Sequence, residues 1–84
     1  MKIFYSQRFK KDLSSFPAGI KRIYNKQQDI FIVNWKDHRL HVKKVINTPL
    51  FSFRVTRNYR VLFKFIDENS VLFASIGHRK DIYD

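Results

Sequence analysis

The sequence predicts an α+β fold in which an N-terminal helical hairpin packs on one side of a small, antiparallel-dominated β-sheet. The first half of the chain contains two stretches whose apolar residues recur at helical spacing, with a break around residues 14–17. The second half contains two alternating apolar segments and one continuously apolar segment, which are typical of neighbouring strands. The 84 residues contain no linker or internal repeat, so we expect one domain over residues 1–84.

A strand and a short helix are expected first. Residues 2–5 alternate in the manner of a short strand. Ser6 is a residue type that caps helices, and Phe9 and Leu13 share one helical face. The first helix should therefore cover residues 7–14.

The second helix has the clearest helical pattern. Pro17 suits its first turn, because the missing N–H of proline costs no hydrogen bond there. The helix should end between Asn34 and Lys36. We interpret its apolar stripe as a core face and assign it no function. The stripe consists of Ile20, Ile23, Tyr24, Gln27, Ile30 and Phe31.

The segment after this helix is the hardest to interpret. Residues 36–48 show no clear period and fit either an extended or an irregular segment. Residues 47–49 are Asn, Thr and Pro, a turn signal before the next strand.

The next two segments predict a β-hairpin whose apolar faces fix the length of its turn. Those faces carry Phe51, Phe53 and Val55 on the first strand and Tyr59, Val61, Phe63 and Phe65 on the second. A two-residue loop would pair Val55 with Arg60 and mix the faces. A three-residue loop over residues 56–58 pairs Val55 with Tyr59, and Asn58 tolerates the left-handed conformation that such loops often need.

The same register places Arg54 directly opposite Arg60 on the less apolar face of the hairpin. Facing like charges destabilise a sheet, and a bound anion would relieve that cost. Two converging guanidinium groups suit a phosphate. The alternative is that both side chains extend into solvent as ordinary surface arginines.

A third strand is expected over residues 71–76, after a polar turn at residues 67–70. It is apolar throughout, as expected of a strand that is covered on both faces. Gly77 should end this strand, and residues 78–83 should form a basic, aromatic tail.

The composition restricts the partners. The chain carries 17 Lys and Arg residues against 7 Asp and Glu residues, a net charge of +10. A folded domain this basic usually meets a polyanion or an acidic protein, although the charge could also serve solubility alone. The sequence has no cysteine, which excludes disulfides and thiolate metal sites and fits a reducing cytoplasm. No apolar run approaches the length that predicts a membrane span.

The chemistry expected of the chain needs no metal and no cofactor. His38 and His41 lie close in sequence but have no third ligand nearby, and no glycine-rich phosphate loop is present. A metal-free site rich in basic and aromatic side chains could still cleave RNA, because the 2′-hydroxyl nucleophile belongs to the substrate. The protein then has to orient that hydroxyl, stabilise the charged phosphorane and protonate the leaving oxygen.

Candidate catalytic residues gather in the last third of the chain. Arg54 and Arg60 suit stabilisation of negative charge. His78 is the side-chain type of the tail that transfers protons near neutral pH, or else a capping or strand-ending surface residue. Arg79 suits a phosphate clamp, and Tyr83 could stack on a base or donate its hydroxyl.

These residues resemble the RelE/ParE superfamily of bacterial and archaeal toxins, especially its RelE-like branch. The resemblance spans nearly the whole chain, and its most specific parts are residues 53–63 and 77–83, with a further segment at residues 40–45. It implies a small antiparallel-dominated sheet with two helices packed on one side. For the RelE-like branch it implies cleavage of messenger RNA in the ribosomal A site, which leaves a cyclic phosphate, and inhibition by a cognate antitoxin.

The resemblance also implies roles for single residues. Arg60, in the Tyr-Arg pair after the hairpin turn, matches the arginine that stabilises the phosphate, and Arg54 matches the basic residue on the preceding strand. Arg79 and Tyr83 match the arginine and tyrosine of the last motif. Ser52 departs from the pattern, because the best-known members carry there a lysine implicated as a base.

Other residues could replace the charge that is missing at Ser52. Lys43 or Lys44 could supply it, or His78 could take the proton role as histidines do in some relatives. Without one of these, the fold would stand but nuclease activity would not be expected. The candidate RNA-binding residues are Lys43, Lys44, Arg57 and Lys80.

The expected function is that of a toxin in a type II toxin–antitoxin system, a cytoplasmic, ribosome-dependent messenger RNase held by an acidic antitoxin in a hetero-oligomer. Contacts to ribosomal RNA and none to membranes are expected. Two alternatives stay open. One is a ParE-like toxin that acts on DNA gyrase without cleaving RNA, which Ser52 favours and Arg60 and Arg79 oppose. The other is an inactive relative that only binds RNA or the ribosome.

Overall fold

A computed structural model of the protein describes residues 1–82. In chain order the elements are β1 (Lys2–Tyr5), α1 (Gln7–Ser14), α2 (Ala18–Val33), the 3-10 helix η1 (His38–Leu40), β2 (Lys43–Lys44), β3 (Phe51–Arg54), β4 (Tyr59–Asp67), β5 (Ser70–His78) and α3 (Arg79–Ile82). The strands form one sheet in the order β1-β5-β4-β3-β2. β1 runs parallel to β5, and the other neighbours are antiparallel. No helix within residues 1–82 is long and apolar enough to cross a membrane.

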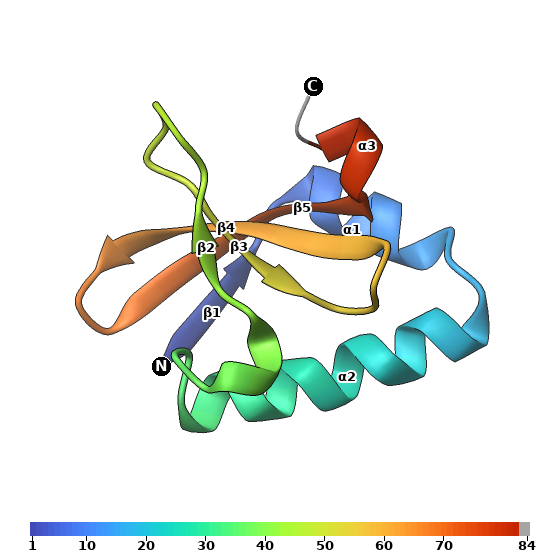
Figure 1. Cartoon of the computed structure of the whole chain (residues 1–84), viewed down its shortest axis with the longest axis horizontal. Coiled ribbons are helices and arrows are strands. Elements are labelled where there is room, and N and C mark those ends of the chain that lie inside the picture. Colours follow the sequence, from blue (N-terminus) through green and yellow to red (C-terminus); the bar gives the residue numbers. More distant parts are fainter. Residues whose placement is uncertain (83–84) are drawn as a thin grey trace.

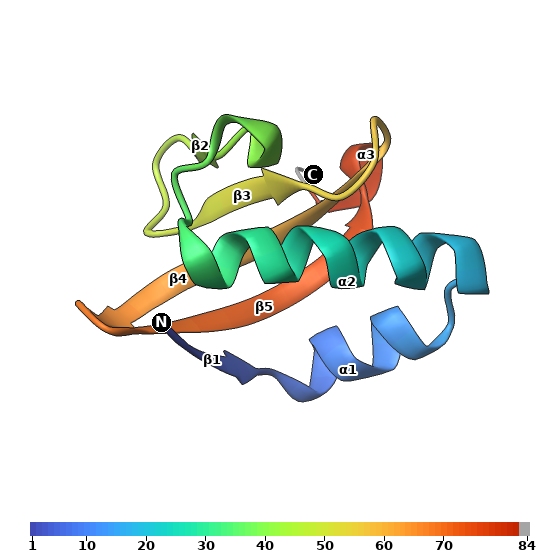
Figure 2. The ribbon, with the colours of Figure 1, turned by 90° about the horizontal axis from the view of Figure 1, so that it is seen from below.

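The two faces of the sheet are covered by different elements (Figures 1 and 2). α2 lies across one face, and α1 packs beside it against β5. The loop between β2 and β3 and the short α3 rise on the opposite side. The predicted α+β fold, with two N-terminal helices on one side of a mostly antiparallel sheet, is therefore confirmed.

The core lies between α2 and the sheet. Phe31 of α2 is fully buried, and its ring centroid lies 5.2, 5.0 and 5.2 Å from those of Phe53, Phe63 and Phe73. Aromatic side chains bury large apolar areas, which offsets the modest core expected of a short chain.

The N-terminal elements follow the sequence pattern closely. β1 and α1 have the predicted bounds, and Oγ of Ser6 accepts a hydrogen bond of 2.9 Å from the backbone N–H of Phe9. α2 starts directly after Pro17 and ends at Val33, one residue before the predicted range. Ile23 was expected on the core stripe but is 41% exposed, so the buried line of α2 is narrower than predicted. That line consists of Tyr24, Gln27 and Phe31.

The segment without a clear period forms η1 and the two-residue β2. Leu40 at the end of η1 is fully buried. The side-chain amide of Gln27 on α2 donates hydrogen bonds to the carbonyl oxygens of Arg39 and Arg54, at 3.1 and 2.8 Å. These long-range contacts hold the segment in place. The spacing of apolar residues within the segment itself could not have predicted them.

The predicted hairpin register is confirmed. Arg54 pairs with Arg60, and the backbone N–H of Val55 donates to the carbonyl of Tyr59 at 2.9 Å. The three-residue loop is therefore the one that keeps the apolar residues of both strands on the same face.

The hairpin loop does not use the left-handed conformation that Asn58 tolerates. Within residues 1–82, the non-glycine residues with positive φ are His41 and Asn47. The loop closes instead through Oγ1 of Thr56, which accepts from the backbone N–H groups of Asn58 and Tyr59 at 3.3 Å each. A threonine hydroxyl can form such a turn without a left-handed residue.

The predicted end of the last strand at Gly77 is also wrong. β5 continues to His78, because Gly77 pairs with Arg60 and His78 pairs with Tyr59 on β4. The chain then enters α3, where the backbone N–H of Arg79 donates to a carbonyl of the β3–β4 loop at 2.8 Å.

We predict that Phe31→Ala lowers the free energy of unfolding by about 3–5 kcal/mol, because it leaves a cavity among buried rings. Val33→Ala, on the same helix but 87% exposed, serves as the control and should change it by less than about 0.5 kcal/mol. Urea denaturation followed by circular dichroism measures both. Equal effects of the two substitutions would contradict the placement of the core.

Candidate functional site

A row of residues crosses the sheet on the side opposite α1 and α2. Arg54 of β3 lies opposite Arg60 of β4, which lies opposite Gly77 of β5. Phe53 and Val61, at the neighbouring positions, are fully buried in the core. Because side chains alternate along a strand, the row projects from the other face, which we call the arginine face.

The two arginines are largely withdrawn from solvent. Arg60 is only 5% exposed and Arg54 is half-buried, so the alternative of two solvent-extended side chains is wrong for Arg60. Nε of Arg54 and Nη1 of Arg60 are buried and have no hydrogen-bond partner in the described part of the chain. Buried guanidinium groups without an acceptor are costly, and an anion would satisfy them.

No ion pair joins a carboxylate to Arg54 or Arg60 within residues 1–82. In the part of the chain that the structure describes, Asp12 pairs with Arg8, and Asp37 pairs with His38 and Arg39. The positive charge of the arginine face is thus not neutralised by an ion pair within residues 1–82.

A cleft of about 650 Å³ opens on the same face. Five of its seven lining residues are basic and come from β2, β4 and α3, so an anion that enters the cleft meets cations from three elements. The loop after β2 forms one wall and α3 forms another, and both rise on the same side of the sheet in Figure 1. The lining residues are Lys43, Lys44, Val45, Ile46, Arg60, Arg79 and Lys80.

Both lysines of β2 line the cleft, but they pair with residues on different faces of β3. Lys43 pairs with Ser52, which lies on the arginine face, whereas Lys44 pairs with Phe51. The ammonium group of Lys44 lies 5.1 Å from the ring centroid of Phe51, in a cation–π contact. Lys43 is therefore the lysine of β2 whose position suits the charge that is missing at Ser52.

Gly77 allows α3 to close down on the arginine face. A Cβ atom at Gly77 would lie 3.0 Å from Cγ2 of Ile82, closer than side chains normally approach. Gly77 stands in the Arg60 row and has no side chain. It therefore leaves room for α3, which brings Arg79 and Lys80 to the cleft.

The structure does not bring His78 to this cleft. His78 pairs with Tyr59, one position along from Gly77, so its side chain leaves the opposite face of β5. Its ring lies 5.7 Å from that of Tyr59, and its Nδ1 accepts a hydrogen bond of 3.1 Å from the backbone N–H of Lys80. His78 therefore stands at a strand end and caps the following turn.

Two other candidate residues are not gathered at the cleft. Arg57 is exposed on the β3–β4 loop and is absent from the cleft lining. Tyr83 lies outside the described residues.

The sequence did not predict the electrostatic environment of His41. The positive charge of Arg54 lowers the pKa of His41, with smaller contributions from partial burial and from Arg60, His38 and Lys43. The His41 side chain is exposed and is absent from the cleft lining. Its spacing from His38 suggested only a metal ligand, and among residues 1–82 no three His, Asp or Glu side chains form a metal-binding group.

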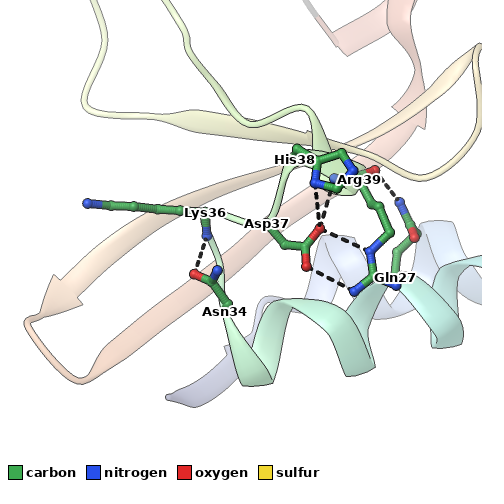
Figure 3. A network of polar contacts seen from close by, with 6 residues as sticks. All are labelled: Gln27, Asn34, Lys36, Asp37, His38 and Arg39. Atoms are coloured by element: carbon green, nitrogen blue, oxygen red, sulfur yellow. Dashed lines mark hydrogen bonds and ion pairs between the residues drawn. The ribbon is translucent and has the colours of Figure 1, made fainter.

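A polar network fixes the 3-10 turn that precedes His41 (Figure 3). Asp37 caps η1 and accepts hydrogen bonds from the backbone N–H, Nε and Nη2 of Arg39, at 2.9, 3.0 and 2.9 Å. Hydrogen bonding by Arg39 holds the pKa of the Asp37 carboxyl well below its usual range. Gln27 reaches the same turn from α2 through the Arg39 carbonyl.

We predict that inorganic phosphate raises the thermal midpoint of the protein relative to chloride at equal ionic strength. Phosphate at ten times its dissociation constant would add about 1.4 kcal/mol of stability. Arg60→Gln should abolish this gain, whereas Arg22→Gln, which removes the same charge from the exposed side of α2, should keep it. A thermal scan measures all three proteins, and an equal phosphate gain in Arg60→Gln would contradict the anion site.

Comparisons with known proteins agree on the fold. The DinJ–YafQ complex from E. coli contains a chain with a TM-score of 0.78 and 13% identity, which covers 99% of this chain and 98% of its own length. The archaeal RelE–RelB complex from Pyrococcus horikoshii gives a TM-score of 0.77, 19% identity and coverages of 95% and 96%. The RelB–RelE antitoxin–toxin complex from Methanococcus jannaschii gives a TM-score of 0.76 and 24% identity, and the match covers 96% of this chain and 95% of the other.

The family assignment comes from sequence. A search of the curated proteins found no match. The family model described as the ParE toxin of the type II toxin-antitoxin system, parDE, matches residues 3–83. With nearly the whole chain matched and RelE and YafQ chains sharing its fold, the protein belongs to the ParE toxin family, within the RelE/ParE toxin superfamily.

Proposed function

We propose that this toxin cleaves messenger RNA on the ribosome without a metal ion. The observation that carries the proposal is the Arg54–Arg60 pair, in which one buried nitrogen atom of each side chain lacks a partner within residues 1–82 and Arg60 lines a basic cleft. Such a pair suits a phosphodiester whose negative charge increases in the transition state.

The reaction proposed for the site is an internal transfer within the RNA. The 2′-oxygen forms a bond to the neighbouring phosphorus, the bond from phosphorus to the 5′-oxygen breaks, and a 2′,3′-cyclic phosphate remains. The proton of the 2′-hydroxyl passes to a base and the 5′-oxygen takes up a proton. Arg54 and Arg60 stabilise the phosphorane, while Arg79, Lys43 and Lys80 hold neighbouring phosphates.

The partner proposed for the toxin is an acidic antitoxin. A net charge of +10 favours an acidic protein, and the solved complexes of similar fold contain the antitoxins RelB and DinJ. A negatively charged antitoxin segment in the basic cleft would compete with RNA for the same arginines, and it would keep the toxin inactive in a hetero-oligomer in the cytoplasm.

We predict that Arg60→Gln lowers the rate of messenger RNA cleavage by about 10²–10³-fold, because it removes a buried donor from the developing charge. Purified protein is added to ribosomes programmed with a defined message, and the cleavage ends are mapped by primer extension and tested for a cyclic phosphate. Arg22→Gln should cleave at the wild-type rate. Wild-type cleavage that Arg60→Gln retains in full would overturn the role of the pair.

A second candidate function is action on DNA gyrase, which the ParE family model favours. A supercoiling assay with purified gyrase distinguishes the two. Inhibition of supercoiling, together with no cleavage of ribosome-bound message by the folded wild-type protein, would replace the nuclease proposal. Growth without arrest on induction would instead indicate an inactive relative that only binds RNA or the ribosome.

A further inference from the structure

The basic cleft has an apolar wall in addition to its cations. Two of its seven lining residues, Val45 and Ile46, are apolar, and both belong to the loop that follows β2. This loop rises from the sheet on the same side as α3 (Figure 1). A bare anion would use only the cations of the cleft, whereas the apolar wall suits a ligand that carries an apolar group beside its negative charge.

Ile46 is the more exposed of the two apolar residues. Its side chain is 83% exposed, whereas Val45 is half-buried. Single exposed apolar side chains are common on protein surfaces, so exposure alone does not indicate a site. The position of Ile46 is what distinguishes it. Within residues 1–82, the other large apolar side chains that are exposed do not line the basic cleft.

The loop holds Ile46 at the corner of a tight turn. The carbonyl of Val45 accepts hydrogen bonds from the backbone N–H and from Oγ1 of Thr48, at 3.3 and 2.9 Å. The N–H of Val45 donates to the carbonyl of Leu50 at 2.9 Å, and the N–H of Leu50 donates to Oγ1 of Thr48 at 3.1 Å. Asn47 has a φ of 63°, the positive value that the third residue of a type II turn requires. Ile46, the second residue of the turn, therefore stands on a fixed backbone.

A fixed isoleucine in water is well suited to bind an apolar surface. Its side chain is branched at Cβ, which restricts χ1 even where the side chain is exposed. A ligand that packs on Ile46 therefore orders few additional groups of the protein. It also removes the apolar area of Ile46 from water, which is favourable.

A nucleotide combines the two properties that the cleft requires. Its phosphate is an anion, and the faces of its base gain free energy when a side chain covers them. Arg60 is 5% exposed and its Nη1 has no partner within residues 1–82, so it marks the place of the phosphate. The cleft volume of about 650 Å³ is larger than one phosphate group needs and lies within the range of about 300–1,000 Å³ that is typical of ligand pockets.

We propose that Ile46 covers the base of the nucleotide whose phosphate lies at Arg60. This inference rests on the proposed RNA cleavage and names a residue that distinguishes RNA from other polyanions. The cations of the cleft bind the backbone of any polyanion, because contacts to phosphate carry no information about the base. Ile46 adds a contact that only a ligand with a base can make. A nucleotide held at both its phosphate and its base has less freedom to rotate in the cleft.

The test compares two single-stranded probes that the toxin cannot cleave. One is a short 2′-O-methyl oligoadenylate, whose 2′-oxygen is blocked, and the other is an abasic oligomer with the same number of phosphates. Wild type should bind the oligoadenylate about 5–10-fold more tightly in fluorescence anisotropy, because partial burial of an isoleucine side chain contributes about that factor. Ile46→Asn should lose this difference, whereas Ile46→Met, which stays apolar, should keep most of it.

Two other substitutions separate the base contact from charge and from general surface effects. Val33→Asn makes a similar change at a side chain that is 87% exposed but absent from the cleft, and it should bind both probes as wild type does. Lys80→Gln should weaken both probes equally and lower the slope of log affinity against log salt concentration by about 1. Ile46→Asn should leave that slope unchanged. It should also keep the thermal stabilisation by inorganic phosphate, because phosphate has no base.

The outcomes separate this inference from the proposed function. Equal binding of the two probes by wild type, or an undiminished difference in Ile46→Asn, would overturn the role of Ile46 and leave RNA cleavage standing. No cleavage of ribosome-bound message by the folded wild-type protein would overturn the proposed function. The comparison of the two probes would then still decide whether Ile46 contacts a base. Thermal midpoints show that each variant is folded.

Discussion

The antiparallel register of β3 and β4 is the constraint on which the site depends. Phe53 lies opposite Val61 and Arg54 lies opposite Arg60, so the same pairing that fills the core also brings two cations together. A slip by one residue would send the arginines into the apolar core and the phenylalanines out of it. The rings around Phe31 therefore fix the geometry of the arginine face as firmly as any contact on that face.

This arrangement of the two arginines lowers the stability of the folded protein. Facing like charges and buried guanidinium atoms without acceptors both oppose folding, and the aromatic core has to offset them. A phosphate group or a carboxylate of a partner would supply the missing acceptors. A protein built in this way gains stability from its ligand, which links the binding of RNA or of an acidic partner to the stability of the toxin.

The sequence was sufficient to predict the structure where the spacing of apolar residues and the alternation of side chains along a strand determine it. The alternation of Phe51 to Val55 against Tyr59 to Phe65 admitted one loop length, and the register followed from it. The bounds of β1 and α1 followed from a cap and two apolar residues. The family match and the fold agreed with the resemblance carried by residues 53–63 and 77–83.

The sequence was insufficient where contacts between residues far apart in the chain determine the structure. η1 and β2 exist because Gln27 and Leu40 anchor them to α2 and the core, and neither contact has a local signal. Asn58 had the right residue type for a left-handed turn, yet Thr56 closed the loop by another route. A glycine commonly ends a strand, but Gly77 has a partner on β4 and instead makes room for α3.

The position of His78 shows how one residue of register assigns a side chain to a face of the sheet. His78 belongs to the motif that suggested catalysis, but it follows Gly77, which occupies the arginine row, and alternation therefore directs it to the helix side beside Tyr59. Chemistry-bearing side chains in a small sheet act together only when they share a face. The parity of the strands therefore weighs more than motif membership, and it separates His78 from the row that contains Arg54, Arg60 and Gly77.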